Sequence, residues 1–142
     1  MLAKDIMTTN VLTVKPETTL IEVSEILRSK RVSGLPVVND DNEVVGIITI
    51  TDLMKVLDRI YKWKDLEKRD SDLKISGRFE EEKKNSKVKD FMTTDVLTLT
   101  EDSTIDFVRQ KMFTNKIHTL PVVKDGKLIG IIGKHDLVIA CF

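Results

Sequence analysis

The sequence is poor in the residues that define several classes of protein. A single cysteine, Cys141, among 142 residues excludes an internal disulfide framework and a four-cysteine zinc site. Six glycines and three prolines exclude collagen-like and low-complexity chains. No apolar run approaches the roughly 20 residues that cross a bilayer, and no continuous apolar stretch follows the first residues as in a secretion signal. We therefore expect a cytoplasmic protein without a membrane partner.

An excess of charge of one sign is also missing. The chain has 23 basic and 23 acidic residues, so no global basic field captures nucleic acid or anionic lipid. A local pocket can still bind an anion. Apolar residues make up 41% of the chain and charged residues 32%, which is typical of a globular protein with one compact domain or two very small ones.

Residues for catalysis are scarce. The two histidines, His118 and His135, do not form a Ser-His-Asp order with a nucleophile elbow. No glycine-rich phosphate loop of the Walker or dinucleotide type is present. The sequence therefore predicts a protein that is not an enzyme, without a metal site and without an obligatory cofactor.

An internal repeat is the most informative feature that the sequence does contain. Residues 4–13 return as residues 89–98, and residues 35–38 return as residues 120–123. Between residues 4–38 and 89–123, 14 of 35 positions are identical. A unit of roughly 50 residues buries too little surface to be stable alone, so the two copies should pack together with pseudo-twofold symmetry.

Both copies show the same pattern of expected elements: strand, helix, strand, strand, helix. In the first copy these are a strand over 11–14, a helix over 18–30 capped by Thr18 or Thr19, a hairpin of 35–38 and 44–49, and a helix with four apolar residues on one face, Leu53, Val56, Leu57 and Ile60. In the second copy, residues 124–127 predict an Asp-Gly hairpin turn, and helices are expected over about 103–115 and 134–141.

The pattern divides the chain into a first repeat over 1–64, a charged helical connector over 65–88 and a second repeat over 89–142. From Lys64 to Lys89, 16 of 26 residues are charged and both signs occur. We expect a solvated connector with a mobile link around Ser76 and Gly77.

The repeated blocks resemble a known family. The Asp-x-Met-Thr opening, the x-Leu-Pro-Val-Val strand and the Gly-Ile-Ile-x-x-x-Asp-Leu close are similar to those of a tandem pair of CBS domains, named after cystathionine β-synthase. The resemblance covers about residues 4–64 and 89–141. It implies an α+β fold of two βαββα repeats, packed with pseudo-twofold symmetry through small mixed sheets.

The resemblance also implies a function. Such pairs are non-catalytic regulatory modules that bind adenosine-containing ligands (AMP, ADP, ATP or S-adenosylmethionine) in clefts between the repeats. Binding passes a conformational signal, often of energy status, to an effector protein or to a domain outside the chain. Such modules also pair, so we expect a homodimer.

The first cleft implied by the resemblance joins the strand-to-helix junction of the first copy to a base pocket and a phosphate-facing histidine of the second. Its residues are Thr49, Thr51, Asp52, Val96, Leu97, Ile117 and His118. A carboxylate accepts hydrogen bonds from a ribose diol, and the start of a helix offers N–H groups to a phosphate. Two structural readings stay open: Asp52 as an ordinary helix cap, and His118 as a partly buried histidine satisfied by backbone.

The second implied cleft has the matching positions, Thr9, Val11, Val32, Ser33, His135 and Asp136. Here Gly133 stands where the first copy has Thr49, and His135 stands where it has Thr51. Because the hydroxyls on the phosphate side are missing, we expect unequal sites, with the first the tighter.

Two other classes of function remain open. The chain can be a protein-interaction or dimerisation module whose clefts are vestigial, or a module that binds another ligand, such as a metal ion, a dinucleotide or nucleic acid.

Overall fold

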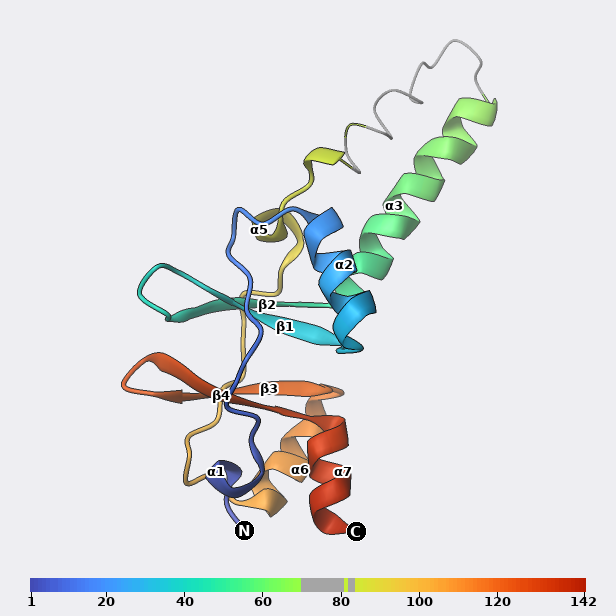
Figure 1. The fold of residues 1–142 in the computed structure, drawn as a ribbon. Coiled ribbons are helices and arrows are strands. Elements are labelled where there is room, and N and C mark those ends of the chain that lie inside the picture. Colours follow the sequence, from blue (N-terminus) through green and yellow to red (C-terminus); the bar gives the residue numbers. More distant parts are fainter. Residues whose placement is uncertain (70–80, 82–83) are drawn as a thin grey trace.

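The computed structural model describes residues 1–69, 81 and 84–142 (Figure 1). In chain order its helices and strands are α1 (Ala3–Ile6), α2 (Leu20–Lys30), β1 (Gly34–Val38), β2 (Val44–Thr49), α3 (Ile50–Arg69), α5 (Val88–Phe91), α6 (Ile105–Asn115), β3 (Thr119–Lys124), β4 (Lys127–Gly133) and α7 (Lys134–Cys141). No helix in this described part combines the length and apolar character needed to span a bilayer.

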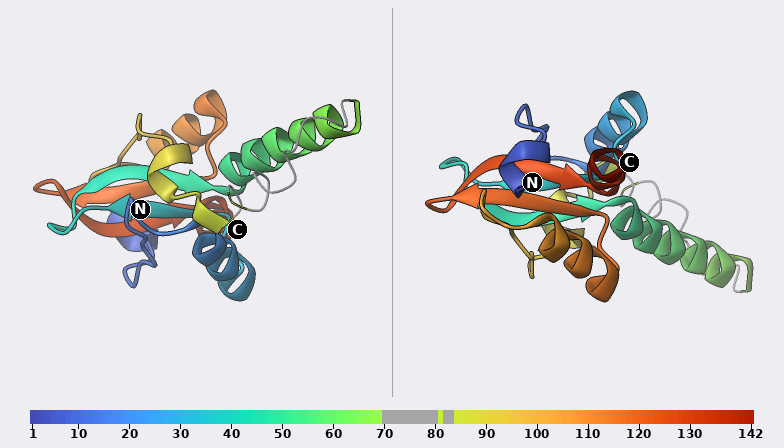
Figure 2. Two further views of the ribbon diagram at one scale, coloured as in Figure 1. Left: turned by 90° about the horizontal axis from the view of Figure 1, so that it is seen from above. Right: turned by 90° about the horizontal axis from the view of Figure 1, so that it is seen from below.

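The elements form a stack of layers with two antiparallel hairpins in the middle. β1 pairs with β2, and β3 pairs with β4. Helices α2, α3 and α5 lie on the outer side of the first hairpin, and α1, α6 and α7 lie on the outer side of the second (Figure 1). The views from above and below show the two hairpins stacked over each other (Figure 2). This is the expected α+β fold.

Local sequence explains the start of the helices and the turn of the second hairpin. Thr19 caps α2, and its side chain and that of Glu22 exchange hydrogen bonds with each other's backbone N–H, as expected from capping chemistry. Thr104 accepts from the backbone of Phe107 at the start of α6. Asp125 and Gly126 both have positive φ, 51° and 79°, which confirms the predicted Asp-Gly turn.

Two of the expected local features are wrong. Residues 11–14 form no strand: Val14 makes only an isolated parallel bridge to Val37, because this segment pairs with β1 at one point and then leaves the sheet. Leu57 is 46% exposed, whereas Val56 and Ile60 are buried, so the packed stripe of α3 is narrower than expected. Helix α3 continues to Arg69, into the expected connector, and the expected link at Ser76 and Gly77 lies outside the described residues.

The two hydrophobic cores do not follow the sequence copies. Val88, the last residue of the expected connector, and Phe91 of the second copy pack in the core that contains Val23, Leu35 and Ile48 of the first copy. The opening segment of the first copy likewise packs in the core of the second copy. Ala3 and Met7 pack with Leu120 and Ile132 of the second copy. Each core is therefore completed by a segment from the other copy.

Backbone hydrogen bonds hold these exchanged segments to the hairpins. Thr8 pairs with Ile131 of β4 through two N–H···O bonds of 2.9 and 3.0 Å, and Thr93 pairs with Ile47 of β2 through two bonds of 2.9 Å. A glycine beside each pair lets the segment approach. A Cβ at Gly130 would stand 2.5 Å from Met7 Sδ. Met7 and Met92 are therefore packing residues.

We predict that Gly130→Ala lowers the free energy of unfolding by about 1–3 kcal/mol, because the new methyl group overpacks the site against Met7. The measurement is chemical denaturation of a double-mutant cycle with Met7→Ala. The cost of Gly130→Ala should shrink in the Met7→Ala background. An equal cost in both backgrounds contradicts the packing of residue 7 against β4.

An ion cluster fixes the other end of the exchanged α5 segment. Glu17, which precedes α2, accepts hydrogen bonds from Lys87 Nζ at 2.7 Å and from Lys89 Nζ at 2.8 Å. These bonds, that of Lys87 first, lower the pKa of Glu17 from 4.5 to about 2. The same contact raises the pKa of Lys89.

The lowered pKa predicts how this cluster responds to acid. A carboxylate with a depressed pKa in the folded state stabilises the protein above its unfolded pKa, here 4.5, and the contribution is lost as pH falls toward 2. NMR titration should show the Glu17 carboxyl with a midpoint near 2 in the wild type, and near its ordinary value after Lys87→Met with Lys89→Met. A midpoint near 4.5 in the wild type would contradict the cluster.

Candidate functional site

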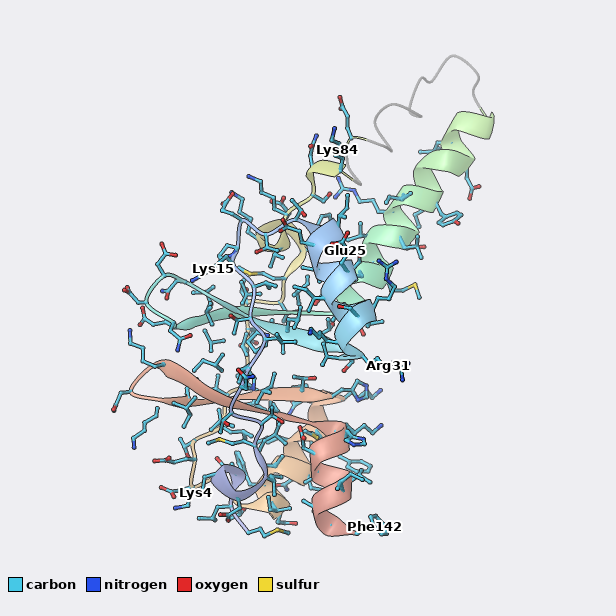
Figure 3. The ribbon with its side chains drawn as sticks, viewed as in Figure 1. Lys4, Lys15, Glu25, Arg31, Lys84 and Phe142 are labelled. Atoms are coloured by element: carbon cyan, nitrogen blue, oxygen red, sulfur yellow. The ribbon has the colours of Figure 1, made fainter. Side chains whose placement is uncertain are left out.

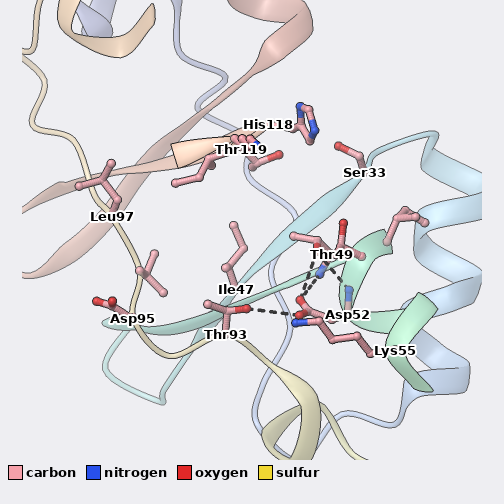
Figure 4. Close-up of a pocket in the computed structure, with 15 residues that line it drawn as sticks. Ser33, Ile47, Thr49, Asp52, Lys55, Thr93, Asp95, Leu97, His118 and Thr119 are labelled. Atoms are coloured by element: carbon pink, nitrogen blue, oxygen red, sulfur yellow. Dashed lines mark hydrogen bonds between the residues drawn. The ribbon is translucent and has the colours of Figure 1, made fainter. Parts of the chain in front are cut away.

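A cavity of about 500 Å³ lies between the two hairpins and has walls from both copies. Its lining includes all seven residues expected for the first cleft, Thr49, Thr51, Asp52, Val96, Leu97, Ile117 and His118. Figure 4 shows Asp52 and Thr49 on one side of this cleft and His118 across it. The volume falls within the range of roughly 300–1,000 Å³ that is usual for small-molecule sites.

Asp52 is the one buried acid among the described residues, with 3% of its surface exposed. Its Oδ2 accepts from the backbone N–H of Thr49 at 2.9 Å and from Thr49 Oγ1 at 3.2 Å, and Thr49 Oγ1 in turn accepts from the Asp52 N–H at 3.4 Å. Asp52 therefore does cap α3. The cap also fixes the direction of the carboxylate at the floor of the cleft.

Thr93 of the second copy completes the surroundings of Asp52. Its hydroxyl donates to Asp52 Oδ1 at 3.3 Å, as the dashed line in Figure 4 marks. The contact is long for an O–H···O bond, which is usually about 2.7–2.8 Å. It joins the two copies at the cavity wall. A carboxylate has about four lone-pair positions, so Asp52 keeps capacity for a further donor.

Three residues line both clefts, Ser33, His118 and Thr119. Ser33 and His118 occupy matching positions in the two copies, so the pseudo-twofold axis passes between them. The imidazole of His118 is exposed and has no hydrogen-bond partner in the described part of the chain. The reading of His118 as a partly buried histidine satisfied by backbone is therefore wrong, and its side chain is accessible to a ligand.

The first cleft also has lining residues that sequence reasoning missed. Thr93 and Asp95 adjoin the expected Val96, and Lys55 follows Asp52 by one helical turn, so proximity in sequence was the available signal. Lys116 also lines the cavity. Lys55 and Lys116 make no ion pair with any residue that the structure describes.

The second cleft is a separate cavity of about 550 Å³. It contains five of the six expected residues, Val11, Val32, Ser33, His135 and Asp136. Thr9 is not in its lining, and its neighbour Thr8 is. Asp136 accepts from the Gly133 N–H at 2.7 Å and from Thr8 Oγ1 at 3.4 Å. These contacts repeat those of Asp52, without the hydroxyl that Thr49 supplies.

A metal site does not emerge from the described residues, since they contain no group of three His, Cys, Asp or Glu side chains arranged around a common point. The lining of both clefts is instead suited to a polar small molecule. Each offers apolar walls, one oriented carboxylate and unpaired cations.

The family follows from comparison with known proteins. The family model described as "CBS domain" matches residues 3–59 and 88–142. Protein MJ1426 of Methanocaldococcus jannaschii is 36% identical over 151 residues, covering 97% of this chain and 89% of that protein. The chain belongs to the CBS domain family and contains two of these domains.

Solved structures of similar chains contain adenosine compounds. The CBS domain pair of protein MJ0100, in complex with 5′-methylthioadenosine and S-adenosyl-L-methionine, superposes with a TM-score of 0.77 at 26% identity, covering 99% of this chain and 95% of that one. CBSX2 in complex with AMP gives a TM-score of 0.76 at 29% identity, again covering 99% and 95%.

Some relatives are much longer than this chain. Protein MJ1225 of M. jannaschii is 31% identical over 135 residues, which is 95% of this chain and 41% of that protein. The inosine-5′-monophosphate dehydrogenase of the same organism is 31% identical over 137 residues, but the chain spans only 23% of its length.

The hydrogen bonds of Asp52 predict its contribution to stability. Asp52→Ala should lower the free energy of unfolding by about 1–2 kcal/mol, because it leaves the part-buried Thr49 N–H without its acceptor. Thr93→Val removes only the long contact between the copies and should cost about 0.5 kcal/mol. Thermal or urea denaturation measures both. Equal stability of wild type and Asp52→Ala would refute the cap.

Proposed function

We propose that this protein is a non-catalytic regulatory module that binds an adenosine-containing ligand between its two CBS domains. The observation that supports this most strongly is the buried Asp52 carboxylate, oriented by its own helix cap into a cavity lined by both copies. The adenosine compounds bound by MJ0100 and CBSX2 support the same class of ligand.

Each part of an adenosine ligand has a complementary group in the first cleft. Asp52 accepts hydrogen bonds from the ribose diol, because a charged acceptor makes the stronger bonds with neighbouring hydroxyls. The apolar side chains of Val96, Leu97 and Ile117 cover the base. Thr51, at the start of α3, and Lys116 and His118 serve a phosphate or another polar substituent.

Binding changes the contact between the copies. When the ribose hydroxyls donate to Asp52, they compete with the Thr93 hydroxyl, which reaches Oδ1 at only 3.3 Å. The ligand then replaces one weak hydrogen bond between the copies by several contacts to both. It therefore favours the arrangement of the two copies that fits it best, which is a shift of population between arrangements.

The shift needs a receiving surface, and the outer face of α3 is suited to that role. Met54, Leu57 and Tyr61 are each at least 46% exposed along a helix whose first turn contains Asp52. The chain spans only 23% of the dehydrogenase relative, so no catalytic role is carried over to this chain.

The test is thermal denaturation with adenosine, AMP, ADP, ATP, S-adenosylmethionine, NAD and Mg²⁺. A ligand at 100 times its dissociation constant stabilises the folded state by about 2.7 kcal/mol. We expect adenosine compounds to raise the melting temperature. Asp52→Asn should retain the fold and lower the ligand affinity at least tenfold, so that the same ligand concentration gives a smaller rise in melting temperature. The matched control is Asp58→Asn, an exposed carboxylate of the same helix outside both clefts.

Flat melting curves for every compound would contradict ligand binding and favour the interaction module with vestigial clefts. A shift with Mg²⁺ or NAD alone would favour the other ligand classes.

A further inference from the structure

The two clefts have similar volumes but differ in the charge of their lining. In the first, the cations Lys55 and Lys116 face two carboxylates, Asp52 and Asp95. In the second, the cations Arg31 and Lys134 face one carboxylate, Asp136. The position that matches Asp95 is the neutral Asn10. The second cleft therefore has one net positive charge more than the first, with all histidines counted as neutral.

One of the two cations of the second cleft lies beside the start of a helix. Lys134 and His135 form the first turn of α7, where the first copy has the uncharged Ile50 and Thr51 in α3. Free N–H groups and a partial positive charge at a helix start already favour anions. A cationic side chain in that turn is unfavourable to the helix itself, so a structural benefit does not explain Lys134.

Arg31 shows a similar structural cost. It ends α2 in the left-handed region, with φ 53°, where glycine is the usual residue because any side chain is disfavoured. Lys116 ends α6 with the same φ in the first cleft, so a cation at this cap is common to both sites. Figure 3 shows Arg31 at the end of α2, at the level between the two hairpins. Neither Arg31 nor Lys134 has an ion-pair partner among the residues that the structure describes.

We infer that the two clefts sort their ligands by charge, and that the second cleft is the site for a polyphosphate, such as a nucleoside triphosphate, while the first takes a neutral or singly phosphorylated nucleoside. This rests on the proposed function for the nucleoside part of the ligand. Lys134, at the helix start where the first cleft has Ile50, and Asn10, in place of Asp95, are the specificity determinants. Arg31, the counterpart of Lys116, is the second cation for the triphosphate. The Thr49 hydroxyl holds the Asp52 carboxylate in place for the ribose, and the second cleft has no hydroxyl at the matching position, so the first cleft binds a nucleoside more tightly.

The experiment follows both clefts in one sample. The backbone amides of Thr49 and Gly133 each donate to the aspartate of their own cleft, so their NMR signals report occupancy separately. The protein is titrated with adenosine, AMP, ATP and inorganic tripolyphosphate. We expect ATP and tripolyphosphate to shift Gly133 at concentrations at least tenfold lower than Thr49, and adenosine to shift Thr49 first.

Two variants test the named residues. Lys134→Ile copies the residue of the first cleft, and Arg31→Gly removes the charge while relieving the left-handed backbone. Each variant should lower the ATP affinity reported by the Gly133 signal by about fivefold to tenfold and leave the adenosine affinity unchanged. Arg31→Gly should melt no lower than the wild type, so a loss of ATP binding is not a loss of fold. The reciprocal Ile50→Lys should strengthen ATP at Thr49 by a similar factor.

The outcomes separate this inference from the proposed function. If adenosine binds, but the ratio of ATP affinity to adenosine affinity is the same at the Thr49 and Gly133 signals, then the two clefts do not sort ligands by charge, and the proposed function is unaffected. Tripolyphosphate binding at Gly133 without any nucleoside binding supports the charge contrast and overturns the adenosine site. A protein whose amides respond to none of the four compounds overturns both.

Discussion

Two pairs of backbone hydrogen bonds, between Thr8 and β4 and between Thr93 and β2, determine how this molecule is built. Each pair joins the opening segment of one copy to the hairpin of the other. Ala3 is then buried in the core of the second copy, and Val88 in the core of the first. Neither copy can complete its core alone. The two hairpins must therefore face each other, and the space between them becomes a pair of clefts with walls from both copies.

The same constraint gives the clefts their chemistry. Thr8 and Thr93 are the last residues held by the exchange, and their hydroxyls reach Asp136 and Asp52. A ligand that binds either carboxylate thus acts at the junction where the copies are joined. Ser33, His118 and Thr119 line both cavities, so a ligand in one cleft can contact residues that also line the other. Regulation by a small molecule needs this link between binding and the arrangement of the copies.

Much of this organisation could be predicted from the sequence, because duplication repeats every local signal. The hairpins, the caps at Thr19 and the Asp125-Gly126 turn depend on neighbouring residues and were predictable from them. The positions of the first cleft came from the resemblance to the family. The exchange of opening segments was not predictable, because residues 3 and 88 are equally apolar whichever hairpin they meet. Thr8, and not Thr9, reaches Asp136, since one residue along an extended chain reverses the side chain.

The directions of Arg31, Lys116 and Lys134 also depended on the structure. Their charges are visible in the sequence, but only the left-handed ends of α2 and α6 and the start of α7 bring them to the cavities. The sequence predicted a weaker second cleft from its missing hydroxyls. The structure places Asp95 in the first cleft and Asn10 in the second, and this exchange gives the two linings different net charges.

The most direct test of the central claim is to measure nuclear Overhauser effects between bound adenosine and methyl groups of the protein. If one ligand is held between the copies, its ribose protons should contact the Thr49 and Thr51 methyls of the first copy. Its base protons should contact the Val96 and Leu97 methyls of the second copy in the same complex. Contacts confined to one copy, or a bound ligand remote from both sets, would contradict a shared cleft.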